Sequence, residues 1–161
     1  MQQICPAKIW ANLCARKRRN HQCEKYGTPL RSKNETNKRR RKFLYNAFLN
    51  YFKNKQRLAS YLPKIQLSGC PNSCAAHQIA ELGFQGKRKK DGAYFNVFVG
   101  GELKTKDVVT LNKSVGELKA ETIPLFLEEM AKILKERKIT YEIYSKQEDF
   151  IDLVKKFEGV I

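Results

Sequence analysis

Apolar residues recur at helical spacing in three parts of the chain. The first part, residues 36–62, carries one apolar stripe flanked by arginines and lysines, and Pro63 ends it. The second part, residues 123–138, has a proline in its first turn and acids near its start. In the third part, Ser145 and Glu148 have the spacing of a capping box before a last helix. The apolar positions of these predicted helices are Phe43, Leu44, Ala47, Phe48, Tyr51 and Phe52; Leu125, Phe126, Met130, Ile133 and Leu134; and Phe150, Leu153, Val154 and Phe157.

Short runs of apolar residues between turn signals predict strands. The clearest run is Tyr94–Val99, which is rich in β-branched and aromatic residues, follows a polar turn and ends at two glycines. The predicted strands are 64–67, 81–85, 94–99, 108–111 and 141–144, and a short helix is predicted over 73–80. This alternation of strands and helices predicts an α+β or α/β domain.

The positive charge of the chain is concentrated in its first part. The chain has 161 residues, a length that suits one domain, and a net charge of +16. Residues 1–65 hold 17 Lys and Arg residues against 2 acids, whereas the remaining residues hold 15 against 14. Residues 1–34 also lack a sustained helical or alternating period. We therefore predict a basic, poorly structured extension over residues 1–34 and one domain over residues 35–161.

The expected location of the protein follows from what the sequence lacks. It contains no run of 18 apolar residues, and its start has no features of an export signal. We therefore expect a cytoplasmic protein with no membrane association. In a reducing compartment, spaced cysteines bind metal or remain thiols more often than they form disulfides. The five cysteines are consequently candidates for metal binding.

The most specific motif is the turn Ser68-Gly69-Cys70-Pro71-Asn72-Ser73-Cys74. Gly69 lets the backbone approach an inorganic centre, and Pro71 fixes one backbone angle. Cys74 is expected in the first turn of the following helix, where free amide groups and the helix dipole stabilise a thiolate. Two thiols at this spacing are therefore placed to hold a metal centre.

Together with the segment Glu81-Leu82-Gly83-Phe84, this turn resembles the iron-sulfur and siroheme signature of the sulfite and nitrite reductase family. The resemblance covers about residues 35–160 and is strongest over residues 65–101. It implies an α+β domain with a mixed sheet flanked by helices, and a [4Fe-4S] cluster next to siroheme. It also implies that Cys70 binds the cluster alone, whereas Cys74 bridges the cluster to the siroheme iron.

The resemblance further implies an earlier cysteine pair with C-x5-C spacing, placed before Glu35-Thr36. Counting back from this dipeptide gives positions 23 and 29, of which Cys23 matches and Pro29 does not. Cys14 or Cys5 could supply the missing ligand, although neither spacing matches. We interpret the chain as a truncated or frame-disrupted relative of a longer reductase. The ligands at matching positions are Cys23, Cys70 and Cys74.

The activity implied by the resemblance is the six-electron reduction of sulfite or nitrite, with electrons passing from the cluster to siroheme. The implied partners are sulfite or nitrite, an electron donor such as ferredoxin or a flavoprotein subunit, and the missing half of the reductase. Because family members are several times larger, we expect no independent turnover from this chain.

Two other functions remain open on the residues alone. One is a small basic nucleic-acid-binding protein with a tetrahedral zinc site. His77 with Cys23, Cys70 and Cys74 could form that site, or the pair His21 and Cys23 could contribute to it. Otherwise, we expect His77 to be a surface residue or a hydrogen-bonded residue of the short helix. A haem-free [4Fe-4S] electron carrier is the second alternative.

Two basic segments bear on possible partners. Arg39–Lys42 lies beside aromatic residues and would suit nucleic acid. The helical spacing of those aromatics instead favours a solvated helix face, so a nucleic-acid partner is not expected. Lys87–Lys90 is a predicted hairpin loop that would also attract an acidic electron donor.

Overall fold

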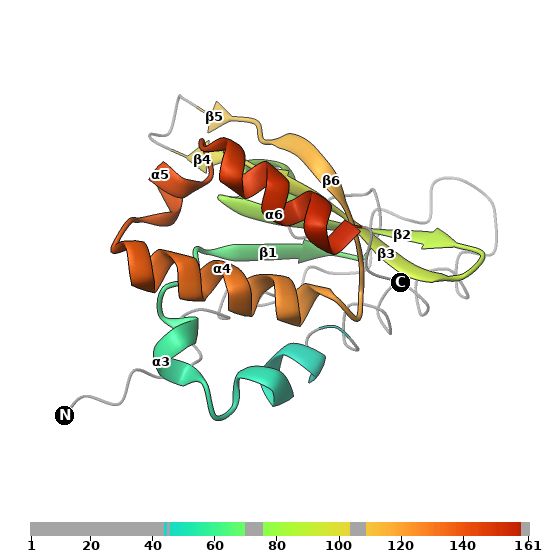
Figure 1. Cartoon of the computed structure of the whole chain (residues 1–161). Coiled ribbons are helices and arrows are strands. Elements are labelled where there is room, and N and C mark those ends of the chain that lie inside the picture. The colour runs from blue at the N-terminus through green and yellow to red at the C-terminus, as the bar shows by residue number, and fades with distance from the viewer. Residues whose placement is uncertain (1–43, 45, 70–75, 104–108, 159–161) are drawn as a thin grey trace, which may run out of the picture.

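The structure is a computed structural model of the whole chain, and it describes residues 44, 46–69, 76–103 and 109–158. Its main sheet has the strand order β1-β2-β3-β6 (Figure 1). β1 is parallel to β2, whereas the other two pairs are antiparallel. The sheet is therefore mixed, as expected of the α+β domain. Its strands are β1 (Ile65–Ser68), β2 (Leu82–Lys89), β3 (Gly92–Val99) and β6 (Lys113–Lys119).

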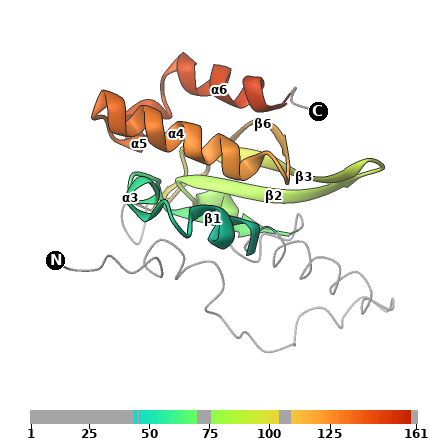
Figure 2. The ribbon, with the colours of Figure 1, turned by 60° about the horizontal axis from the view of Figure 1, so that its bottom comes forward.

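One face of this sheet is apolar and is covered by helices. Leu67, Phe84 and Val97 are paired across β1, β2 and β3, and all three are buried. The row continues in β6 at Gly116, where a Cβ would lie 2.6 Å from Cγ1 of Val154. The missing side chain of Gly116 thus lets α6 (Glu148–Glu158) approach the sheet. α4 (Ile123–Arg137) lies beside α6 on the same face (Figures 1 and 2).

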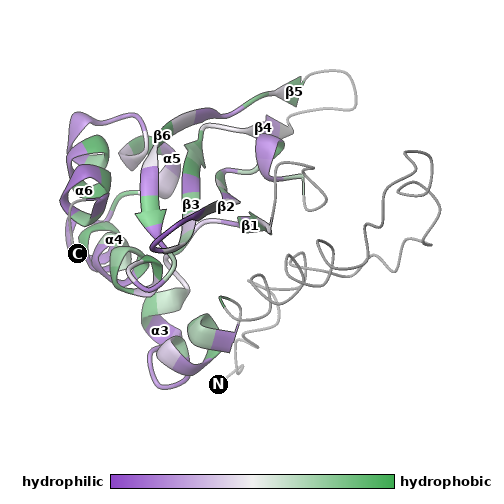
Figure 3. Cartoon of the chain, turned by 90° about the vertical axis from the view of Figure 1, so that its right-hand side faces the viewer, coloured by the Kyte–Doolittle hydropathy of each residue, from purple (hydrophilic) through white to green (hydrophobic). Residues whose placement is uncertain are grey.

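Both of these helices are amphipathic, as their sequence pattern predicts. α4 begins after Thr122, whose hydroxyl donates to the Lys119 carbonyl at 2.9 Å, and it ends at Lys138 in the left-handed conformation. Figure 3 shows hydrophilic and hydrophobic residues along both helices. No helix in the described part of the chain is long and apolar enough to cross a membrane. The buried residues are Ile123, Pro124, Phe126, Leu127, Met130, Ala131 and Leu134 of α4, and Phe150, Leu153, Val154 and Phe157 of α6.

The helix predicted over residues 36–62 is interrupted in the part that the structure describes. Residues 46–52 are helical, residues 53–54 form a turn, and α3 (Gln56–Ala59) follows. The apolar stripe is confirmed, because Leu44, Phe48 and Phe52 are buried. The turn residues are exposed, so no burial of apolar surface supports a helix there.

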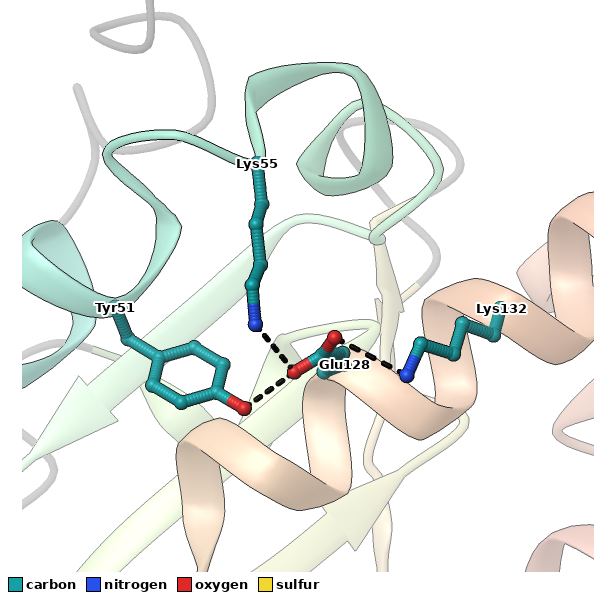
Figure 4. Close-up of polar contacts among 4 residues, drawn as sticks. All are labelled: Tyr51, Lys55, Glu128 and Lys132. Carbon is teal, nitrogen blue, oxygen red and sulfur yellow. Dashed lines mark hydrogen bonds and ion pairs between the residues drawn. The ribbon is translucent and has the colours of Figure 1, made fainter.

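A polar network joins this N-terminal helical region to α4. The Glu128 carboxylate accepts hydrogen bonds from the Tyr51 hydroxyl and from the Lys55 ammonium, the latter at 2.8 Å (Figure 4). Lys132, one helical turn further along α4, pairs with the other carboxylate oxygen at 3.1 Å. These contacts bring together residues more than seventy positions apart in the sequence.

Residues 141–144 form a helix, α5 (Tyr141–Tyr144), and the prediction of a strand there is wrong. The amide of Ser145 donates to the Tyr141 carbonyl at 2.8 Å, which closes one helical turn. Tyr141 and Tyr144 are three residues apart and therefore lie on the same side of this helix, which is the buried side. The aromatic residues predict a strand because aromatic side chains are enriched in strands. A short helix that buries them carries the same composition.

The capping box predicted before α6 is also wrong. Glu148 is the first residue of the helix, whereas a capping box needs the acid at the third helical position. The Ser145 hydroxyl instead donates at 3.3 Å to the carbonyl of Glu142 in the preceding helix, α5, which ends at Tyr144.

β6 is not predicted from the sequence, whereas one strand of a second, two-stranded sheet is. β4 (Glu102–Leu103) pairs with β5 (Val109–Thr110), which lies within the predicted strand 108–111. β6 was missed because it lies at one end of the main sheet and buries little apolar surface, with Leu118 fully buried and the other residues partly exposed or exposed. A register shift between Val97 and Phe98 of β3 further breaks the alternation between these two strands.

Candidate metal centre

The cysteine turn connects the end of β1 to the 3-10 helix η2 (His77–Ile79) and then to β2. Cys70 and Cys74 lie outside the described residues, and so does Cys23. The structure does describe both ends of the turn, Ser68–Gly69 on one side and Ala76–His77 on the other. Only residues 77–79 of the helix predicted over 73–80 are helical in the described part.

His77 joins the two ends of the turn. Its side chain is fully buried, and its Nδ1 lies 2.8 Å from Oγ of Ser68, the last residue of β1. The imidazole also packs against Phe98 of β3, with ring centroids 5.2 Å apart. The preceding residue, Ala76, has the left-handed φ of 51°, which is unfavourable for a residue with a Cβ. His77 is therefore a buried, hydrogen-bonded residue, and the alternative of a surface position is excluded.

The second ring nitrogen of His77 is left without a partner. Nε2 is buried and makes no hydrogen bond with the described residues. Burial lowers the pKa of His77, so the neutral imidazole is favoured, with one N–H and one free lone pair. Ser68 forms a hydrogen bond with the group at Nδ1, and the group at Nε2 has no hydrogen-bond partner. Because buried polar atoms nearly always have a partner, Nε2 points to a missing one.

Two glycines let the described ends of the turn lie close to β2. A Cβ on Gly83 would collide with the carbonyl oxygen of His77. A Cβ on Gly86 would lie 2.6 Å from the carbonyl oxygen of Gly69. Both glycines belong to β2, so this strand supports the turn at its start and at its end. The approach of the His77 carbonyl explains why the segment after the cysteines needs a glycine at position 83.

Asn112 holds η2 in place from a distant part of the chain. Its side-chain amide donates to the His77 carbonyl, and its backbone amide donates to the Gln78 carbonyl at 2.9 Å. The same side chain also lies 3.4 Å from the Ala80 carbonyl oxygen. Sequence reasoning missed Asn112 and Phe98, because nothing in their local sequence relates them to the cysteines.

The electrostatics of the β2–β3 hairpin differ from the simple cationic loop that was predicted. Lys87 and Lys89 both pair with Glu117 of β6, the first at 3.1 Å. Burial raises the pKa of Glu117, but the hydrogen bonds from Lys89 and Lys87 outweigh it and leave that pKa lowered. Glu117 thus stays ionised and neutralises part of the charge of this hairpin.

Other concave features and clusters add no metal site. Within the described ranges, no three His, Cys, Asp or Glu side chains lie close enough to hold an ion. A hollow of about 960 Å³ lies between Leu62–Pro63, Gly100–Glu102 and the α4–α5 connection. It is lined by lysines and glutamates together with apolar residues, and it contains no described cysteine or histidine.

The fold agrees with comparisons to known proteins. The family model described as "Nitrite and sulphite reductase 4Fe-4S domain" matches residues 36–155. Among solved structures, the NirA protein of Mycobacterium tuberculosis matches with a TM-score of 0.50 and 20% sequence identity. That match covers 70% of this chain but only 22% of the NirA chain. No curated protein matches. The chain therefore belongs to the family of nitrite and sulfite reductase 4Fe-4S domains.

Proposed function

We propose that this chain is the [4Fe-4S]- and siroheme-binding part of a sulfite or nitrite reductase. Its family membership supports an iron-sulfur domain. The observation that carries the proposal is the support given to both ends of the cysteine turn. The buried imidazole of His77 forms a hydrogen bond with Ser68 at the other end of the turn. Gly83 and Gly86 of β2 leave room for the backbone of His77 and of Gly69. Such close backbone approach and an unpartnered buried nitrogen fit an inorganic group held by the turn.

The residues proposed to hold the cluster are Cys23, Cys70 and Cys74. Thiolates are the ligands that iron-sulfur clusters take in proteins. In this proposal Cys70 binds the cluster alone and Cys74 bridges it to the siroheme iron. When bound, the cofactor pair supplies single electrons for the six-electron reduction of sulfite or nitrite. The chain's own contribution is to fix the turn on β1 and β2 and to exclude water from its base.

The proposed domain boundary places an N-terminal extension at residues 1–34 and the cofactor domain at residues 35–161. This chain aligns with only 22% of the NirA protein. We therefore assign the rest of the siroheme and substrate contacts to a missing reductase half. Ferredoxin or a flavoprotein subunit would deliver electrons to the complex, in the cytoplasm.

Anaerobic reconstitution with ferrous iron and sulfide tests this proposal. We expect a brown protein with a broad sulfide-to-iron absorption shoulder, and additional siroheme bands when siroheme is supplied. Replacing Cys70 or Cys74 with Ser is expected to abolish cluster binding, whereas Cys14→Ser serves as the matched control and leaves it intact.

Each of the other functions has its own outcome in this experiment. A colourless protein that binds zinc and nucleic acid would contradict the proposal and support a zinc protein. A cluster that forms but never takes up siroheme would identify a haem-free electron carrier. Equal iron retention in the Cys74→Ser and Cys14→Ser variants would refute the ligand assignment.

A further inference from the structure

The ring of His77 holds η2 against the end of β1. Its Nδ1 lies 2.8 Å from Oγ of Ser68, and this contact joins the two described ends of the cysteine turn. The imidazole is fully buried, and one of its faces packs against Phe98. The attachment of η2 to β1 therefore depends on a side chain that can take up a proton near neutral pH.

The surroundings of this ring suit a neutral imidazole and not a charged one. The residues that the neighbouring elements place against His77 all lack a charge: Ser68 of β1, Gly83 of β2, Phe98 of β3 and Asn112 of the link between β5 and β6. A charged imidazole carries an N–H on both nitrogens, and within the described part of the chain Nε2 has no acceptor. Protonation would therefore bury an unpaired charge and an unpaired donor together, which is costly.

Acidic side chains do not compensate for this charge. The nearest acid along the chain is Glu81, and its carboxylate accepts the backbone amide of Lys64 at 3.2 Å instead. Burial lowers the pKa of His77 from its ordinary 6.5, and no charged neighbour contributes to this shift. A proton consequently binds better to a state in which the ring has left its site than to the folded one.

η2 is a short element that can leave the sheet on its own. It has three residues, and its backbone bonds are long, from the Ile79 amide to the Ala76 carbonyl at 3.2 Å and from the Ala80 amide to the His77 carbonyl at 3.4 Å. Ala76 has the left-handed φ of 51°, which is unfavourable for a residue with a Cβ. When His77 leaves its site, Ala76 is able to return to a favourable conformation, which assists the release.

We propose that His77 is a pH-sensitive switch, in which the neutral ring fastens η2 to the end of β1 and uptake of one proton releases η2 from the sheet. The pH thereby sets whether the two described ends of the cysteine turn are held together. The switch operates in the chain before any cofactor binds, so it does not depend on the proposed function.

Hydrogen exchange of the full chain, without added iron, tests the switch. The amides of Ile79, Ala80 and Asn112 donate to carbonyls of residues 76–78, so their protection reports on η2. As the pH falls below 6.5, their protection factors are expected to fall by about tenfold per pH unit, the dependence for uptake of one proton. Protection of Phe84 and Val97, within the sheet, is expected to stay unchanged.

Two variants assign the effect to one histidine. His77→Gln removes the titrating group, so protection of η2 is expected to become independent of pH over this range. His21→Gln, at the other histidine of the chain, is the matched control and keeps the pH dependence. The ring signal of His77 in the nuclear magnetic resonance spectrum of the unaltered chain covers the case in which His77→Gln does not fold. It is expected to titrate below pH 6.5, in step with the loss of protection.

Four results would overturn the switch. Protection of η2 that stays constant below pH 6.5 would show that protonation does not release it. A His77 ring that takes up its proton while η2 stays protected would show that the site tolerates the charge. Equal pH dependence in His77→Gln would assign the effect to another group. A parallel loss of protection at Phe84 and Val97 would identify unfolding of the whole sheet instead of a local release.

Discussion

At the scale of single residues, two positions other than glycine adopt the left-handed conformation among the residues that the structure describes. Ala76 has φ 51° and leads into His77, and Lys138 has φ 52° and ends α4. A Cβ makes this conformation unfavourable by roughly 1 kcal/mol or more. At Lys138 the conformation closes a helix, a position where glycine is usual. At Ala76 it directs the chain inward so that the next side chain enters the core.

Lys138→Gly is expected to stabilise the fold by up to about 1 kcal/mol, because it removes the unfavourable contact of the Cβ. The free energy of unfolding in urea measures the effect. Lys135→Gly, inside the same helix, is the control and is expected to destabilise by roughly 1 kcal/mol. Destabilisation by both variants would show that the C-terminus of α4 does not depend on the left-handed residue.

Gly83→Ala is expected to act in the opposite direction. Its Cβ would collide with the His77 carbonyl, which is backbone and is also held by Asn112. We expect a loss of roughly 1–3 kcal/mol of stability together with reduced cluster occupancy. Thermal unfolding and iron content measure the two effects. Unchanged values for both would mean that η2 moves freely away from β2.

At the scale of elements, the cysteine turn is anchored by segments that follow it in the chain. η2 is held by β2 behind it and by Asn112, which lies in the link between β5 and β6. The support for the end of the turn therefore depends on the link between β5 and β6, which lies more than thirty residues after His77. A domain that lacked this link would keep the cysteines and lose the contacts at the end of the turn.

Asn112→Ala tests this anchoring. The change leaves the His77 carbonyl without its side-chain donor, and it is expected to cost about 1 kcal/mol or slightly more. Hydrogen exchange at residues 78–80 is expected to quicken, while exchange within β2 and β3 stays slow. Asn96→Ala is the matched control, since the Asn96 amide donates at 3.2 Å to Gln85 Oε1 of β2 and not to η2. Equal exchange in the two variants would contradict the anchoring role.

The elements that could be predicted from the sequence are those whose own residues carry the signal. β3 is rich in β-branched and aromatic residues between turn signals, and α4 has apolar residues at helical spacing, because each buries one face against the core. β6 and α5 have weaker signals, since one lies at the end of the sheet and the other is a single turn. In the site, the glycine at position 83 belongs to the motif and was found with it. Asn112 is 35 positions from His77, and only folding brings the two together.

At the scale of the whole molecule, the N-terminal helical region and α4 are joined through Glu128. The pKa of this carboxyl group is lowered from its usual 4.5 to about 2, chiefly by the hydrogen bonds from Lys55 and Tyr51. A carboxyl group whose pKa is lower in the folded state stabilises that state above the unfolded pKa. The stabilisation by Glu128 is therefore complete above about pH 4.5 and is lost as the pH falls towards 2.

Glu128→Gln is accordingly expected to lower the free energy of unfolding by roughly 1 kcal/mol at neutral pH, since solvent screens part of the interaction. The difference from the unaltered chain should persist down to about pH 4.5 and then shrink as the pH approaches 2. Lys132→Ala is the control, because its exposed pair within one helix contributes little. A difference that did not change with pH would mean that the charge of Glu128 is irrelevant.

The last turn of α6 bears on self-association. The carboxylate of Glu158 accepts the backbone amide of Glu117 at 3.2 Å, next to the point where Gly116 meets the helix. β6 is the terminal strand of the sheet, and a terminal strand with free amides invites a strand from a second molecule. Because the Glu158 carboxylate occupies one of these amides, we expect Glu158→Ala to increase association between the edges of two molecules.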